Sequence, residues 1–167
     1  MGECNILVMG RTIEYDGLFD LGGFIKVLDL WFKDRNYNKR ETKNFEEVYE
    51  DSRQVTIEMF PYKKISDNIR FEIRLFMIFS KLKDTTVEKE GKKIKILNGH
   101  AMVSIDGYMI TDYEDKWDKT PFYYFMRTIF DRYIHRDYIS QAKKAFMQDV
   151  AEIEDEMKSY LNMFRYK

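Results

Sequence analysis

The sequence predicts an α+β domain in which a curved antiparallel sheet of about five to six strands is covered on one face by a long C-terminal helix. Over residues 68–82, apolar and polar side chains alternate as in a strand with one buried and one solvated face. Residues 138–164 instead repeat apolar side chains every three or four positions, the spacing of a helix. Only two prolines and eight glycines interrupt the 167 residues, so we expect long elements within a single domain, residues 1–167.

The N-terminal third predicts a strand followed by a helix. Residues 5–15 form the expected first strand, and residues 20–37 follow as an amphipathic helix. We expect the Asp20 side chain to cap the first turn of this helix by accepting backbone hydrogen bonds. Its apolar face consists of Leu21, Phe24, Ile25, Leu28, Trp31 and Phe32.

The middle of the chain predicts the sheet. A short edge strand is expected around residues 45–49, and a further strand over residues 53–62. In residues 69–79 the odd-numbered side chains are apolar, and our central expectation is that they lie beneath the C-terminal helix. The even-numbered side chains Arg70, Glu72 and Arg74 point the other way, toward water, as does Glu58 of the preceding strand.

The second half of the sheet leaves one alternative open. Residues 85–97 predict a hairpin around Glu90 and Gly91, and residues 100–113 predict another strand region. Within that region, Asp106 and Gly107 either close a tight hairpin or mark a bulge in one long strand. We favour the bulge because the flanking segments are short for two separate strands.

Two helices are expected after the sheet. Thr120 and Pro121 suit the start of an aromatic helix, because threonine caps a helix and proline fits its first position. The last helix presents an apolar seam of Ile139, Ala142, Phe146, Val150, Ile153, Met157, Tyr160 and Phe164. Amphipathic helices are the available cover for a sheet with one apolar face, which gives a two-layer arrangement.

This order of elements resembles the helix-grip fold of the START and SRPBCC superfamily. In that fold an antiparallel sheet curls around a long C-terminal helix, and a cavity often lies between them. The resemblance covers most of the chain and is carried by element order, not by a sequence motif. It implies a cavity between the sheet and the C-terminal helix, and it assigns no functional residue.

Composition narrows the classes of partner and the compartment. Lysine and arginine total 28 against 29 acidic residues, so the near-neutral charge argues against a nucleic-acid partner. No apolar run approaches the roughly 20 residues that a membrane span needs. The single cysteine allows no internal disulfide, and the N-terminus lacks a signal-peptide pattern, so we expect a cytoplasmic protein.

Catalytic and metal-binding patterns are not found in the sequence. It has two histidines and one cysteine, without metal-ligand spacing, a P-loop or a nucleophile elbow. We therefore expect no cofactor, no metal and a function other than catalysis. An unrecognised enzyme would have to use buried polar groups, for which the first candidates are Arg70, Arg74, His100 and Asp106.

The abundance of aromatic and methionine side chains is the remaining signal. Thirteen phenylalanines, twelve tyrosines, ten methionines and two tryptophans form either a heavily aromatic core or an apolar ligand pocket. The functional hypothesis is a non-enzymatic domain that binds a hydrophobic small molecule between the sheet and the C-terminal helix. The predicted ligand-binding residues are Trp31, Met59, Met77, Phe122, Met126 and Phe146.

The alternative hypothesis is a protein-interaction or homo-oligomeric module. The polar side of the 68–82 strand turns apolar near its end, so another element or a partner should cover it there. Tyrosine and tryptophan side chains beside charges, as in residues 112–124, are typical of contact surfaces. The predicted interaction surface consists of Phe76, Ile78, Tyr113, Trp117, Tyr123 and Tyr124.

Overall fold

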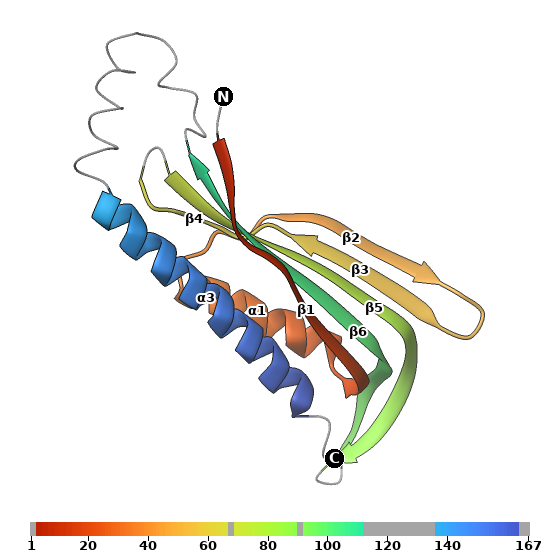
Figure 1. Ribbon diagram of the computed structural model, residues 1–167. Helices are drawn as coiled ribbons and strands as arrows, with labels where there is room; N and C mark the ends of the chain where they lie inside the picture. The colour runs from red at the N-terminus through yellow and green to blue at the C-terminus, as the bar shows by residue number, and fades with distance from the viewer. Residues whose placement is uncertain (1–2, 67–68, 90–91, 112–135, 164–167) are drawn as a thin grey trace.

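The computed structural model describes residues 3–66, 69–89, 92–111 and 136–163. They form two layers, an open six-stranded antiparallel sheet and two helices that lie on one of its faces (Figure 1). The predicted fold class is confirmed, and the arrangement is compatible with a helix grip. The elements are β1 (Glu3–Phe19), α1 (Leu21–Asp34), β2 (Glu41–Val48), β3 (Arg53–Met59), β4 (Tyr62–Lys64), β5 (Ile69–Lys89), β6 (Lys92–Thr111) and α3 (Arg136–Asn162).

The sheet is built around one long hairpin. The strand order is β1-β6-β5-β3-β2, and β4 pairs with β5 beside this path. Strands β5 and β6 pair up to Lys89 and Lys92, on either side of the expected turn, whose residues lie outside the described ones. The arms of the predicted hairpin are therefore the ends of two long strands and not a separate hairpin. The strand predicted over residues 45–49 is the edge strand β2, which begins earlier. The structure therefore has two long paired strands where the sequence predicts several shorter ones.

The Asp106–Gly107 pair does not close a hairpin, because β6 continues unbroken through it. The irregularity lies in the partner strand β1, where Val8 pairs with Gly107 and Arg11 pairs with Ile105. Met9 and Gly10 form this bulge, and Gly10 has a φ of +69°, which glycine adopts without steric cost.

Helix α1 forms where its apolar spacing predicts. Phe24, Leu28 and Phe32 are buried, and the other three residues of the predicted face are partly buried. The expected side-chain cap is wrong, since the Asp20 carboxylate makes no capping hydrogen bond. The Asp20 backbone carbonyl instead accepts the Phe24 N–H at 2.9 Å, so the first turn closes through the main chain.

The core lies between the inner face of the sheet and both helices. Along β5, the odd-numbered side chains from Phe71 to Phe79 are buried, as expected. Phe71 stacks on Phe146 of α3 with ring centroids 4.7 Å apart, whereas Phe79 meets Phe24 of α1 edge-on at 6.0 Å. The central expectation is confirmed for α3 at one end of this row, and α1 covers the other end.

Helix α3 follows the predicted seam from Phe146 to Met157, after which Leu161, which was not predicted, is buried and the predicted Tyr160 is only partly buried. Its fully buried side chains contact the sheet and α1, while its other faces carry most of its charges. The aromatic helix expected after Thr120 and the last seam residue, Phe164, lie outside the described residues. The buried seam consists of Phe146, Val150, Ile153, Met157 and Leu161.

Polar contacts fix α3 against both ends of α1. At the start of α1, the Tyr160 hydroxyl donates to the Asp20 carbonyl at 3.3 Å. A Cβ at Gly23 would lie 2.1 Å from that hydroxyl, so glycine permits this close approach. Just beyond the other end, the Tyr37 hydroxyl donates to the buried carboxylate of Asp149 at 2.8 Å. In the described ranges, neither helix has the length and apolar character needed to cross a membrane.

Candidate functional site

A groove opens between the start of α1 and the inner face of the sheet near β2 and β3. We call it the α1 groove. Its volume is about 510 Å³, within the roughly 300–1,000 Å³ of small-molecule pockets. Its apolar lining comes from α1, β3 and β6 and consists of Leu21, Ile25, Val55, Ile57, Ile96 and Leu97. Its polar lining consists of Asp20, Asn44, Glu46, Arg53, Asp84 and Lys95.

Arg53 is the central polar residue of this groove. Its guanidinium contacts Glu46 of β2 at 3.3 Å and Asp84 of β5 at 3.1 Å. A second hollow of about 370 Å³ lies beside the groove, and Arg53 and Asp84 line both. The Arg53–Asp84 ion pair therefore stands between the two hollows.

The groove has two hydrogen-bond donors to offer. The Nε of Arg53 is buried and has no hydrogen-bond partner in the described part of the chain. Because this Nε is also closed to solvent, a ligand acceptor can bond to it only after the Arg53 side chain shifts, and that bond would offset the cost of the unpaired donor. Lys95 is exposed on the rim and forms no ion pair with a described residue.

The charge balance limits the ligands that this groove suits. Its lining has three carboxylates against two basic groups, and Arg53 is already paired with two of those carboxylates. A multiply charged anion would meet net repulsion. An apolar body with one carbonyl or singly charged acidic head matches both the apolar lining and the two donors.

Three of the predicted ligand-binding residues lie in the core. Met59, Met77 and Phe146 are each about 1% exposed or less, and neighbouring side chains fill the space around them. Trp31 is partly buried at the end of α1, with its ring 5.6 Å from that of Tyr37. None of these four lines the α1 groove, and Phe122 and Met126 lie outside the described residues.

Two of the predicted interaction residues lie on the outer face of the sheet. Phe76 and Ile78 are partly buried there, and the guanidinium of Arg74 lies 5.4 Å from the Phe76 ring centre. Tyr113, Trp117, Tyr123 and Tyr124 lie outside the described residues.

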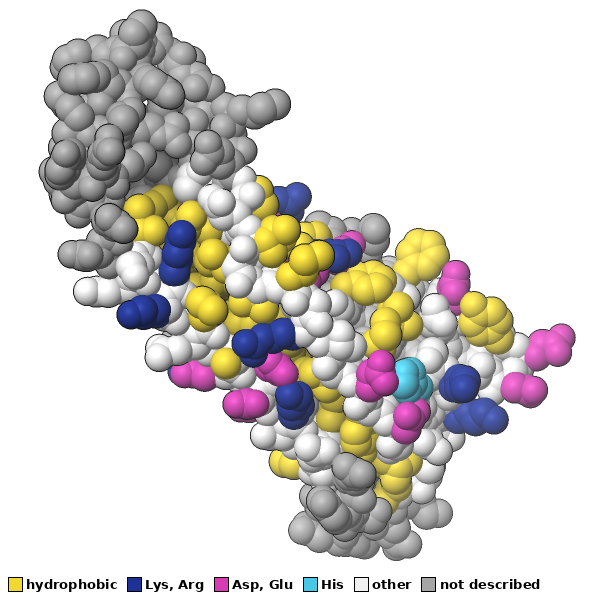
Figure 2. All heavy atoms as spheres, in the orientation of Figure 1, with side chains coloured by type: hydrophobic (Ala, Val, Ile, Leu, Met, Phe, Trp, Pro, Cys, Tyr) yellow, Lys and Arg dark blue, Asp and Glu magenta, His cyan; other side chains and the backbone are white. Residues whose placement is uncertain are grey.

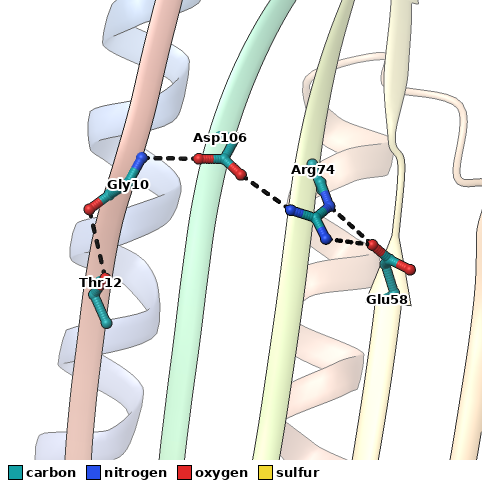
Figure 3. Close-up of polar contacts among 5 residues, drawn as sticks. All are labelled: Gly10, Thr12, Glu58, Arg74 and Asp106. Atoms are coloured by element: carbon teal, nitrogen blue, oxygen red, sulfur yellow. Dashed lines mark hydrogen bonds and ion pairs between the residues drawn. The ribbon is translucent and has the colours of Figure 1, made fainter.

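The outer face also carries a row of charges, shown in Figure 3, of which the sequence predicts the shared face of Glu58 and Arg74 but not the position of Asp106 beside them. Arg74 of β5 contacts Glu58 of β3 at 2.8 Å and Asp106 of β6 at 3.3 Å. The other oxygen of Asp106 accepts the Gly10 N–H of the β1 bulge at 2.8 Å. Hydrogen bonds to Glu58 raise the pKa of the Arg74 guanidinium above its ordinary value. This row satisfies the bulge amide and links four strands, which is a structural role.

The expectation that Glu58 and Glu72 face water is wrong. They point away from the core, but they are only 6% and 9% exposed. Glu72 stands between Tyr62 of β4 and Tyr108 of β6 in the strand register, and these large side chains shield it. Arg70 lies 3.4 Å from Glu72.

The remaining polar candidate, His100, lies at the surface. Its Nδ1 is 2.8 Å from an oxygen of the exposed Asp16. Among the described residues, no group of three or more His, Cys, Asp or Glu side chains is arranged to hold a metal ion.

A scan against protein-family models, a search of curated proteins and a search of solved structures each found no match to this chain. The functional proposal therefore depends on this chain's own residues.

Proposed function

We propose that this chain is a non-enzymatic binding domain that holds an amphipathic small molecule in the α1 groove. The apolar part of the ligand packs against Ile25, Val55 and Ile57, and its polar head accepts hydrogen bonds from Arg53 and Lys95. One observation supports this most strongly: a partly apolar volume of about 510 Å³ is lined by Arg53, whose buried Nε has no partner among the residues that the structure describes.

The position beside α1 follows from how the core is filled. Phe146, Ile153 and Met157 occupy the space between α3 and the sheet and are almost completely buried. The starting turns of α1 leave the β2–β3 end of the inner face open. A ligand in that space lies between sheet and helices without displacing core side chains.

Binding without catalysis is favoured by the chemistry of the lining. The described residues of the groove include no histidine, cysteine or serine. Two of the three carboxylates, Glu46 and Asp84, are paired with Arg53, which leaves them poorly placed to act as general bases.

The proposal includes membership of the START and SRPBCC superfamily and a cytoplasmic location. The order of elements and the sheet packed on a C-terminal helix support the first. The exposed and unpaired Cys4 supports the second, because thiols persist in reducing compartments.

Calorimetric titration with anilinonaphthalene sulfonate tests the groove, since this probe joins apolar rings to one negative charge. Ile25→Trp should fill the groove and weaken binding about tenfold, equivalent to ~1.4 kcal/mol. The matched control is Leu30→Trp, on the same helix at a side chain that is 61% exposed. Equal affinity in the two variants, or no binding by the wild type, would contradict the proposal.

A second variant tests the polar head. Lys95→Gln removes an exposed cation that has no ion pair among the described residues, so the fold should be unaffected. We expect weaker binding of the sulfonate probe and unchanged binding of an uncharged naphthalene analogue. A near-ultraviolet circular dichroism spectrum for each variant checks that the core remains packed.

A further inference from the structure

Strand β2 presents an open edge. In the described part of the chain β2 pairs only with β3, and it ends the sheet on that side (Figure 1). The free N–H and C=O groups of such an edge are a template for pairing with another strand, and proteins usually protect them.

The opposite edge of the sheet is protected by a bulge and a contact with α3, whereas β2 has only the charged side chains in its sequence for protection among the described residues. Strand β1 is bulged at Met9 and Gly10, and its Arg11 is held by Glu154 of α3 at 2.7 Å. Strand β2 has its irregularity near its beginning, and residues 43–48 keep an unbroken register with β3. A regular stretch of that length is suited to accept another strand.

Exposed apolar side chains gather along β2 and the turn after it. Phe45 is 62% exposed, Val48 78% and Tyr49 56%. Figure 2 shows apolar side chains standing out among acidic ones over this part of the molecule. Phe45 pairs with Thr56 in the register and so lies on the outer face of the sheet, away from the helices.

We propose that β2 pairs antiparallel with β2 of a second copy of this chain, in a register centred on Phe45. The two open six-stranded sheets then join across a two-fold axis. The register places Phe45 opposite Phe45 on the outer face. It places Asn44 opposite Glu46, so an amide donor meets a carboxylate acceptor, and position 43, a lysine in the sequence, opposite Glu47. Each unlike pair occurs twice by symmetry.

The neighbouring registers are less favourable. A register centred on Glu46 sets that carboxylate against its own copy, and like charges directly opposite are destabilising. A register centred on Asn44 sets Glu47 opposite position 41, also a glutamate in the sequence. Opposite residues in antiparallel strands share a face. A symmetric pairing of β2 with itself can therefore change only by moving its centre from one residue to the next. The Phe45-centred register is therefore self-complementary in charge, and its adjacent ones are not.

The size of this contact predicts a reversible dimer. A stable interface usually buries roughly 800 Å² on each partner, and a single eight-residue strand offers less. We expect the dimer to form with rising protein concentration. Phe45 and Glu47 do not line the α1 groove, so dimer formation and ligand binding can fail independently.

Sedimentation equilibrium over a wide range of concentration tests the dimer. The average mass should rise from 20.3 kDa toward twice that value. Phe45→Lys should weaken dimerisation about tenfold or more, because it replaces the central aromatic pair with two like charges. Glu47→Lys should also weaken it, and adding Lys43→Glu should restore the affinity to within about threefold, since the charges are exchanged and the register is kept.

The control is Met9→Lys, which changes an apolar side chain that is 77% exposed on the opposite edge strand. It should leave the dimer unchanged, and thermal unfolding should show that every variant folds. A wild type that stays monomeric at all concentrations overturns the proposal. Such a result overturns it even if β2 is found to pair with a strand from a different protein. A dimer that tolerates Phe45→Lys, or one that the double exchange does not restore, overturns it as well.

Discussion

Gly107 permits a close approach between β6 and Phe146 of α3. A Cβ at this position would lie 2.8 and 3.0 Å from two ring carbons of Phe146 and 3.3 Å from the Cβ of Val8. We predict that Gly107→Ala lowers the free energy of unfolding by about 1–3 kcal/mol, the usual cost of overpacking a core. Denaturant unfolding measures this loss, and Phe146→Leu in the same chain should relieve part of it.

Gly22 provides the matched control for this glycine. A Cβ there would find Asp20 Oδ1 at 3.4 Å as its nearest neighbour, which is an ordinary contact. Because alanine favours a helix over glycine by up to about 1 kcal/mol, Gly22→Ala should be neutral or stabilising. Similar losses at both positions would show that contact with Phe146 is not the cause.

Asp106 satisfies the amide of the β1 bulge. Asp106→Ala leaves the Gly10 N–H without its acceptor and removes one partner of Arg74, so we expect a loss of about 1–3 kcal/mol. Asp106→Asn retains an acceptor oxygen and should cost less. Urea unfolding gives both values, and hydrogen exchange at the Gly10 amide should accelerate in the alanine variant.

The comparison for Asp106 is Asp16→Ala, which removes an exposed carboxylate paired with His100. Exposed pairs contribute little, so stability should change by less than about 0.5 kcal/mol. If the two alanine variants lose the same amount, Asp106 has no special role at the bulge.

The sequence reveals these residues only in part. Alternation places Glu58 and Arg74 together on the face away from the core, as the structure finds. It cannot place Asp106 beside them, because Arg74 and Asp106 are neighbours across the β5–β6 pair, and alternation within one strand does not determine that register. It also misses the burial of Glu58, which depends on large side chains from adjacent strands.

At the scale of the elements, the contact between the end of α1 and α3 requires Tyr37 in its protonated form, because only the protonated hydroxyl can donate to Asp149. Burial raises the pKa of this phenol, and the nearby Asp149 carboxylate raises it further. Arg35 and Lys63 also face Asp149, at 3.6 and 3.9 Å. A raised pKa in the folded state gives stability that is complete below the ordinary value of 10.0 and is lost as the pH rises beyond it.

We predict that Tyr37→Phe costs about 1 kcal/mol at neutral pH, because it removes the hydrogen bond to Asp149. Above pH 10.0 the wild type should lose stability faster than the variant, so the difference between them should narrow. Thermal unfolding of both proteins along a pH series measures this difference. A gap that stays constant into the alkaline range would contradict the assignment.

Element types follow from the sequence better than element lengths do. The spacing of apolar residues identifies α1, α3 and the inward face of β5. The alternation predicts a strand over residues 68–82, whereas β5 continues to Lys89. The structure shows an irregular register between Ser80 and Lys83, with Lys81 at a φ of +54°, after which Leu82 is buried. A bulge changes the phase without ending the strand, and a periodicity argument cannot distinguish the two.

In the whole molecule, the α1 groove exists because α1 covers only part of a long sheet. Its lining comes from α1, β2, β3, β5 and β6, which are far apart in the sequence. Each of these residues is ordinary in its own element, so no local pattern marks them. The sequence predicted a cavity between the sheet and the C-terminal helix, and the proposed site lies instead beside the first helix.

The most direct test of the central claim is to map the ligand-binding surface in solution. Proton–nitrogen correlation spectra recorded during a titration with anilinonaphthalene sulfonate report on backbone amides and on the Arg53 Nε–H. We predict that the largest shifts fall on the Arg53 Nε–H and on the amides of Ile25, Val55 and Leu97, while the amides of Val150 and Ile153 in α3 stay unchanged. Shifts centred on α3, or no shift at the Arg53 Nε–H at saturation, would contradict a binding site in the α1 groove.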